Sequence, residues 1–225
     1  MTKKFELTEN KLNWNGRTLY QIKALKAFIT NSGVSVNVGE LGGWIEKEEN
    51  LSQEGKAWIF DNAKVYDDAR VLGNAVIKDD AQVYDNARVL GNAEVSGNAE
   101  IFRVAVIKDD AKIFDNAKIG GSSRIYGNAE VYDNARVLVN ARVYGNAKIF
   151  DNAEIGGGAE IYDNAGVFDN ALIVEWAKVY GNAKVFDAAQ IGGNTKLSGN
   201  ARMGSRNFLY EWRFARRIRV WKEEI

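Results

Sequence analysis

The chain has 225 residues, of which 46% are hydrophobic and 27% are charged, so it can bury a substantial core. Its 30 basic and 30 acidic side chains cancel, which argues against a general nucleic-acid or anionic-membrane surface. The lack of Cys and His excludes disulfides, thiol nucleophiles, imidazole bases and thiolate or imidazole metal ligands.

Residues 1–50 predict an N-terminal β cap. Asn15 and Gly16 are typical of a two-residue hairpin turn, and residues 18–25 after them have the composition of a strand. Three glycines, at positions 39, 42 and 43, indicate a close approach of this segment to the structure that follows.

A six-residue repeat occupies most of the remaining chain. Residues 57–206 divide into 25 consecutive hexads without an insertion. The first position is Ala in all hexads but two, which have Ser123 and Thr195, and the third is Val or Ile in all but two. Alternation over the first four positions predicts a short strand whose first and third side chains face a core. The Asp-Asn or Gly-Asn pairs that follow predict a corner, because these residues tolerate left-handed backbone angles.

This repeat resembles that of the hexapeptide-repeat, left-handed parallel β-helix family. The resemblance implies an all-β, single-stranded left-handed parallel β-helix in which three hexads form one triangular coil, with about eight coils in total. We therefore expect a cap over residues 1–50, a β-helix over 51–206 and a second cap over 207–225.

A closer resemblance rests on the segment that enters the repeat. Leu-Gly-Gly-Trp-Ile at 41–45, Asn-Leu-Ser at 50–52, Gly55 and Trp-Ile-Phe-Asp at 58–61 are similar to the entry of YdcK-like, often prophage-carried, hexapeptide-repeat proteins. This resemblance is specific for the fold and carries no particular activity.

The C-terminal segment combines aromatic and basic residues. Residues 208–214 and 218–221 predict two strands of a β cap joined at 215–217, with a short helix as the alternative. Six cations and five aromatic residues alternate within 206–222, which favours an amphipathic cap in which Arg stems cover apolar surface, with nucleic-acid contact as the alternative.

Residues 18 apart stack in such a helix, so each outward position forms a column along one face. The face that begins with Tyr66, Tyr84 and Phe102 changes in its second half to glycines that alternate with apolar residues, and apolar residues also replace polar ones nearby. Because exposed apolar patches usually mark contact surfaces, we predict a protein interface there. Its residues are Gly120, Leu138, Val139, Gly156, Leu172, Val174, Trp176 and Gly192.

A second face combines cations with tyrosines. Neighbouring arginines gain no charge complementarity from each other, so an anionic, phosphate-bearing ligand is one interpretation and a solvated basic face is the other. The candidate residues are Arg124, Tyr126, Arg142, Tyr144, Lys178 and Tyr180.

The third face has the alternating charges and stacked aromatics of a structural surface. Its corner stacks aspartates from Asp115 to Asp187, which are favoured in turns and could also attract a cation such as calcium. We predict no metal site there.

Three functions are compatible with these features. The uninterrupted repeat favours a non-enzymatic scaffold or protein-interaction module that binds itself or another protein, and the YdcK-like resemblance suggests a phage or prophage source. Sequestration of a small anionic, nucleotide-like ligand on the basic face is the first alternative. An acyl-CoA-dependent acyltransferase, the activity that the wider family implies, is the second, and the missing His and missing loop insertion disfavour it.

We therefore predict no catalytic residues and no cofactor. The chain has no apolar run that could span a bilayer and begins without the apolar stretch of a signal peptide, so a cytoplasmic protein is expected, in the host cytoplasm if a phage encodes it.

Overall fold

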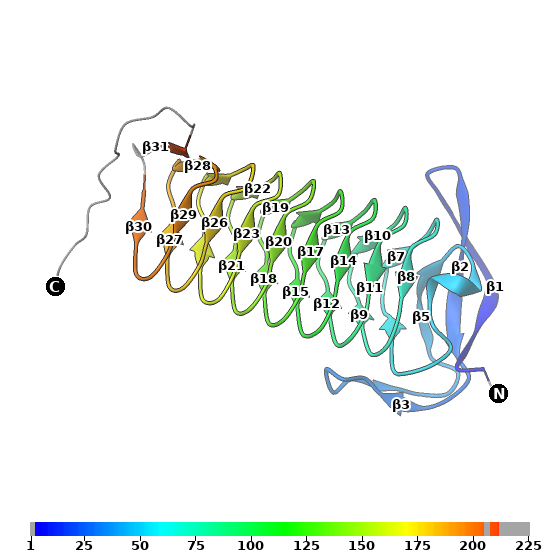
Figure 1. The fold of residues 1–225 in the computed structure, drawn as a ribbon. Helices are drawn as coiled ribbons and strands as arrows, with labels where there is room; N and C mark the ends of the chain where they lie inside the picture. The colour runs from blue at the N-terminus through cyan, green and yellow to red at the C-terminus, as the bar shows by residue number, and fades with distance from the viewer. Residues whose placement is uncertain (1–2, 205–207, 212–225) are drawn as a thin grey trace.

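The computed structural model describes residues 3–204 and 208–211 and shows an elongated parallel β-solenoid (Figure 1). Its strands form three long sheets, which we call sheets I, II and III. Sheet I contains β1 (Phe5–Trp14), β2 (Arg17–Ala24), β5 (Leu41–Ile45), β7 (Lys64–Val65), β10 (Gln82–Val83), β13 (Glu100–Ile101), β16 (Lys118–Ile119), β19 (Arg136–Val137), β22 (Glu154–Ile155), β25 (Leu172–Ile173), β28 (Gln190–Gly193) and β31 (Phe208–Glu211). Sheet II contains β8 (Arg70–Val71), β11 (Arg88–Val89), β14 (Val106–Ile107), β17 (Arg124–Ile125), β20 (Arg142–Val143), β23 (Glu160–Ile161), β26 (Lys178–Val179) and β29 (Lys196–Leu197). Sheet III contains β6 (Trp58–Ile59), β9 (Val76–Ile77), β12 (Glu94–Val95), β15 (Lys112–Ile113), β18 (Glu130–Val131), β21 (Lys148–Ile149), β24 (Gly166–Val167), β27 (Lys184–Val185) and β30 (Arg202–Met203).

Each coil of the solenoid contains 18 residues. Val83 pairs in parallel with Val65 on one side and with Ile101 on the other, and the same register continues through all three sheets. Three hexads therefore make one three-sided coil, as predicted. We number the coils by their strands in sheet I, so that coil 1 begins with β5, coil 2 with β7 and coil 9 with β28.

The core is a column of small and aliphatic side chains. The Ala at the first position and the Val or Ile at the third are almost all fully buried, which confirms the predicted inward positions. Each buried Val or Ile contributes roughly 1.5–3 kcal/mol. The two hydroxyl residues at the first position are compatible with this core because Ser123 Oγ donates to the Gly120 carbonyl and Thr195 Oγ1 donates to the Gly192 carbonyl.

The corners depend on left-handed residues at the fifth position. Asp151 has φ 56°, and the glycines at this position have similar angles. The carboxylate of Asp151 also accepts a hydrogen bond from the backbone N–H of Asp169 in the next coil, at 3.1 Å. Asparagines at the sixth position form side-chain ladders, as between Asn134 and Asn152. The aspartates are thus used as acceptors for backbone donors that the corner leaves unpaired.

The solenoid has nine coils rather than about eight, because it begins before the first hexad. Strand β5 pairs in parallel with β7, and Leu51 bridges to Val71. The side chain of Asn50, in the 3₁₀ turn η1 (Glu48–Asn50), donates to the carbonyl oxygen of Ala69 at 2.9 Å. Sheet I continues past this coil through the predicted hairpin, in which β1 pairs antiparallel with β2 through Asn15 and Gly16, both with positive φ.

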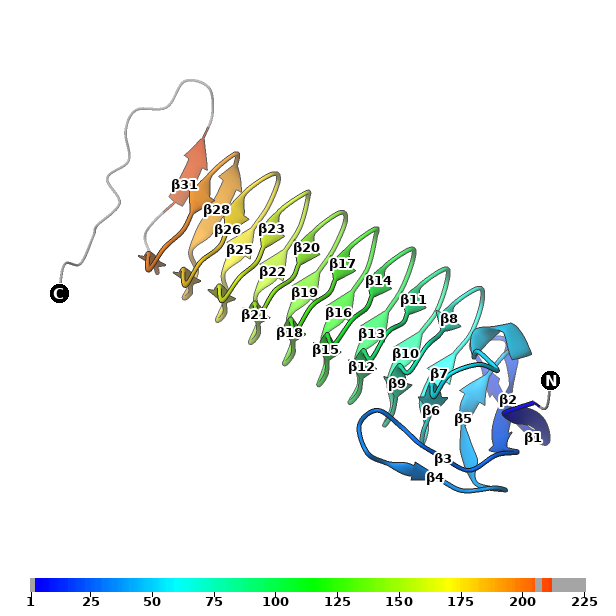
Figure 2. The ribbon, with the colours of Figure 1, turned by 60° about the horizontal axis from the view of Figure 1, so that its bottom comes forward.

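A second, shorter hairpin lies beside the first coil (Figure 2). It consists of β3 (Phe28–Ile29) and β4 (Ser35–Val36). The indole of Trp58, which is fully buried, packs edge-on against Phe5 and Phe28. The N-terminal segment therefore covers the open end of the core.

At the other end, β31 pairs in parallel with β28 and continues sheet I. The predicted turn at 215–217, the second strand at 218–221 and the side chains of the basic and aromatic segment lie outside the described residues. No helix in the part of the chain that the structure describes is long and apolar enough to cross a membrane.

Candidate interaction surface

The eight residues of the predicted interface lie along sheet I and the corner where the chain passes from sheet I to sheet II, which we call the I–II corner. Leu138 follows β19, Val174 follows β25, and Gly120, Gly156 and Gly192 occupy the same column in alternate coils. Parallel pairing places these residues in successive coils at the strand spacing of about 4.8 Å. Leu138 and Val174 are half-buried and the three glycines are buried.

One residue of the predicted interface does not lie at the corner. Leu172 is the second residue of its hexad and lies within β25, in register with Glu154 and Gln190. Its apolar side chain therefore widens the surface across sheet I instead of extending it along the corner.

The I–II corner contains every large apolar side chain that is exposed in the described coils after β5. These are Val104, Val139 and Trp176, which are 50%, 52% and 66% exposed. Val104 is missing from the residues predicted from the sequence, although the criterion that identified Trp176, an apolar residue at a corner position, applies to it equally. The five other exposed large apolar residues, Leu25, Ile29, Val34, Val38 and Leu41, lie in the N-terminal cap and at the start of β5.

Val139 occupies an unfavourable backbone conformation. Its φ is 68°, and the other corner residues with positive φ are glycines, acidic residues and one arginine. A β-branched residue in the left-handed region is strained by about 1–3 kcal/mol. Position 139 thus has a strained, exposed valine where Asp or Gly would adopt the left-handed conformation with less strain.

Two aromatic rings of this surface lie over glycines of neighbouring coils. A Cβ at Gly120 would overlap the ring of Phe102, and a Cβ at Gly158 would overlap the indole of Trp176. A stack of aromatic rings runs from Tyr66 through Tyr84 and ends at Phe102, whose ring centroid lies 5.6 Å from that of Tyr84. The glycines therefore allow the large side chains to lie close to the solenoid.

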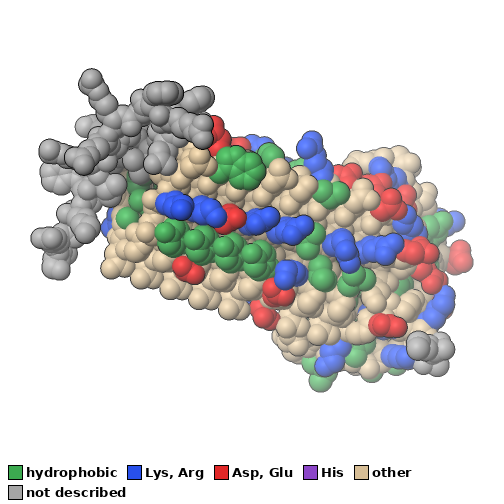
Figure 3. Space-filling view, viewed as in Figure 1, with side chains coloured by type: hydrophobic (Ala, Val, Ile, Leu, Met, Phe, Trp, Pro, Cys, Tyr) green, Lys and Arg blue, Asp and Glu red, His purple; other side chains and the backbone are tan. Residues whose placement is uncertain are grey.

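The predicted anion-binding residues lie together on sheet II. Figure 3 shows this face, with a row of cations interrupted by one carboxylate and a parallel row of hydrophobic side chains. Arg124 pairs in register with Arg142, as expected. Glu160, however, lies 3.4 Å from Arg142 and 2.8 Å from Lys178, so one carboxylate offsets two of the three predicted cations.

The tyrosines of sheet II form a continuous stack. Successive centroids from Tyr126 to Tyr180 are 4.8 to 4.9 Å apart, with nearly parallel rings. Burial, together with the nearby Glu160, raises the pKa of Tyr144 to about 12. Because the ring faces contact one another, the stack presents hydroxyl edges outward rather than faces on which a base could stack.

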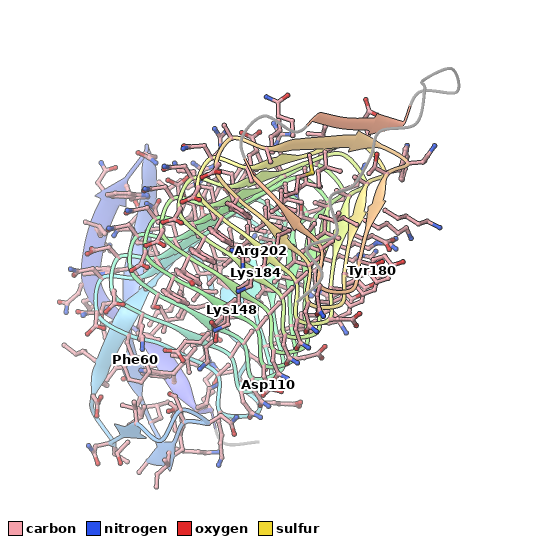
Figure 4. The ribbon with its side chains drawn as sticks, turned by 90° about the vertical axis from the view of Figure 1, so that its left-hand side faces the viewer. Phe60, Asp110, Lys148, Tyr180, Lys184 and Arg202 are labelled. Carbon is pink, nitrogen blue, oxygen red and sulfur yellow. The ribbon has the colours of Figure 1, made fainter. Side chains whose placement is uncertain are left out.

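Sheet III has the features of a structural surface. The stacked rings from Phe114 to Phe186 lie beside a column in which Glu130 and Lys148 form an ion pair at 2.7 Å. Figure 4 shows Lys148, Lys184 and Arg202 on this face and Tyr180 on another. Within residues 3–204 and 208–211, no group of three or more acidic residues is placed to hold a metal ion.

The N-terminal end contains a cationic pocket that the sequence did not indicate. It has a volume of about 730 Å³ and is lined in part by Lys3, Lys4, Lys26 and Phe28. The Lys4 ammonium donates to the carbonyl oxygen of Ala57 at 2.8 Å, and burial lowers its pKa to about 8. Lys4 therefore covers a carbonyl of the first coil.

Comparison with known families identifies the repeat. A family model described as the YdcK beta solenoid repeat matches residues 81–97, which contain the three strands β10, β11 and β12 of one coil. Residues 81–97 are thus similar to the YdcK-type β-solenoid repeat, and the other coils have the same architecture in the structure. No curated protein matches the chain. The matched coil agrees with the parallel β-solenoid of the structure and carries no information about its surface.

Proposed function

We propose that this chain is a non-enzymatic β-solenoid scaffold that self-associates through sheet I and the I–II corner. The observation that supports this proposal is the position of Val104, Val139 and Trp176. A β-solenoid has three corners, and the large apolar side chains exposed in the described coils after β5 all lie on one of them. Exposed apolar residues gathered along one edge of a protein are typical of contact surfaces.

The strained backbone at Val139 supports the same proposal. An exposed valine at a left-handed corner adds no stability to the single chain. Asp at this position would instead accept a hydrogen bond from the next coil, as Asp133 does. If a second copy covers the Val139 side chain, the free energy of burying its apolar surface offsets the backbone strain.

The mass of the particle in solution tests this proposal. Light scattering should give at least twice the 25.0 kDa mass of one chain, and Trp176→Glu should shift the particle to the mass of a single chain. Val38→Glu is the matched control, because Val38 is 68% exposed but lies in the cap. A monomeric wild-type protein, or equal dissociation by both variants, would contradict the proposal.

A further inference from the structure

The cationic pocket at the N-terminal end lies where three separate segments of the chain meet. Its lining comes from residues 3–4 before β1, from residues 26–28 at the start of the shorter hairpin, and from residues 53–55 in coil 1. Figure 1 shows the N-terminus and the hairpin that begins with β3 at this same end of the solenoid. A molecule bound in the pocket would therefore contact the cap and the first coil together.

The buried cation in this lining has no counter-charge. Lys4 is only 4% exposed. Two of the three N–H groups of its ammonium donate to the carbonyl oxygens of Glu54, at 3.4 Å, and Ala57, at 2.8 Å. Within the described residues, no carboxylate forms an ion pair with Lys4, and the lowered pKa of its ammonium agrees with a buried charge that only dipoles stabilise. An anion placed beside it would supply the missing charge.

The other charged groups of the lining leave an excess of positive charge. Lys3 and Lys26 also line the pocket, and Glu54 is the one acidic residue among the lining residues. Lys3 forms an ion pair at 2.6 Å with Glu48, which lies outside the lining. Lys26 is exposed and, within the part of the chain that the structure describes, has no ion-pair partner. Lys4 and Lys26 are therefore the cations available to an anion.

The same pocket has an aromatic wall. The ring of Phe28 belongs to the lining, and the Lys4 ammonium lies 5.9 Å from its centroid. This ring is fixed from behind, because it packs edge-on against the buried indole of Trp58 with 5.6 Å between the centroids. An apolar wall beside a few charged groups is typical of sites for small organic ligands.

The backbone around Lys4 is held in place without a ligand. The side-chain oxygen of Gln53 accepts hydrogen bonds from the N–H groups of Lys4, at 2.7 Å, and Phe5, at 3.2 Å. The amide of Gln53 donates back to the carbonyl oxygen of Phe5, and the N–H of Leu25 donates to that of Lys4. Because the pocket is preformed in this way, a ligand would bind without the cost of ordering the chain.

We propose that this pocket binds a small organic carboxylate with an apolar body, whose carboxylate lies at Lys4 and Lys26 and whose body lies against Phe28. The carboxylate provides the counter-charge that Lys4 lacks, and the body replaces water on the aromatic wall. The site is separate from sheet I and the I–II corner, so the inference does not depend on the proposed self-association.

Benzoate is a suitable probe because it combines the two features in one molecule. We expect benzoate, titrated into the full chain labelled with ¹⁵N, to shift the amide resonances of residues 26–28 and 53–55. Acetate keeps the charge without the ring, and benzyl alcohol keeps the ring without the charge. Each should bind about tenfold more weakly than benzoate or worse, because each lacks one of the two contacts.

Three variants assign the binding to the pocket. Lys4→Met should weaken benzoate binding by about tenfold or more, since a charge-assisted contact is lost. Lys26→Met, at an exposed position, should weaken it by about threefold or more and does not depend on the fold tolerating a change at Lys4. Lys184→Met, which removes an exposed cation from sheet III, is the matched control and should leave binding unchanged. Circular dichroism checks that each variant is folded.

The outcomes are distinct. Preferential binding of benzoate, with loss in the Lys4 and Lys26 variants and none in the Lys184 variant, supports the site. If benzyl alcohol binds as tightly as benzoate, if both lining variants keep wild-type affinity, or if no resonance of the pocket shifts, the proposal is wrong. None of these results changes the mass of the particle, so self-association is tested separately.

Discussion

The indole ring of Trp176 lies across Gly158, the residue one coil earlier at the I–II corner. The backbone of Gly158 is not left-handed, so this glycine is required by the contact and not by its own conformation. Trp176 is thereby held against the solenoid although most of its surface is exposed.

We expect Gly158→Ala to destabilise the fold by at most about 1 kcal/mol, because the added methyl group must displace the exposed indole, which can move toward solvent. Urea denaturation at one protein concentration measures the change. Gly156→Ala is the matched control, since its methyl group would lie 3.8 Å from the nearest Val174 atom and should be tolerated. In a Trp176→Ala background the effect of Gly158→Ala should disappear, and its persistence there would exclude the indole as the cause.

We expect Val139→Asp to stabilise the single chain by about 1 kcal/mol or more, because it removes a β-branched residue from a left-handed corner. The new carboxylate would also accept from the N–H of Gly157, as Asp133 accepts from Asp151. Denaturation in a Trp176→Glu background avoids any contribution from association. Val139→Ala, which removes the β-branching without adding an acceptor, should gain less, and an equal gain would show that the carboxylate's hydrogen bond contributes nothing.

The tyrosine stack on sheet II should weaken the fold at alkaline pH. Burial raises the pKa of Tyr144 to about 12 in the native state, so between about pH 10 and 12 the folded chain holds a proton that the unfolded chain releases. Stability must therefore fall as pH rises through this range. Phenolate absorbance should show late ionisation that coincides with loss of the β-sheet signal. Tyr144→Phe should reduce the slope of stability against pH, and an unchanged slope would show that ionisation of Tyr144 is not the cause of the alkaline destabilisation.

Lys4 should produce the opposite slope at lower pH. Burial lowers its pKa from 10.5 to about 8, so between these values the unfolded chain binds more protons than the folded chain, and stability rises with pH. Below pH 8 the Lys4 ammonium is charged in both states, and the full cost of burying this charge lowers the stability of the folded chain. We expect Lys4→Met to have a thermal midpoint that rises less than that of wild type between pH 8 and 10. Lys26→Met, at an exposed position that also lines the pocket, should leave the wild-type slope unchanged.

The interior and the corners of the solenoid were predictable residue by residue. The alternation of Ala with Val or Ile specifies which side chains turn inward, and Asp or Gly at the fifth position specifies the left-handed corner, because both are local properties of a six-residue segment. The apolar residues along sheet I and the I–II corner were predictable in part, since Leu138 follows from column order and Trp176 from its corner position, whereas Val104 is found only from its exposure in the structure.

Other features depend on contacts between distant residues. The sequence by itself determined the repeat, its inward positions and the three-hexad coil that its resemblance implies. Only the tertiary structure decided that Leu41–Ile45 is the first strand of a coil that precedes the first hexad. It also decided that Glu160 offsets two cations of sheet II and that Lys4 covers a carbonyl of the first coil. The reason is physical: a hexad encodes its own strand and corner, while pairing at the ends and between side chains depends on residues 18 or more positions away.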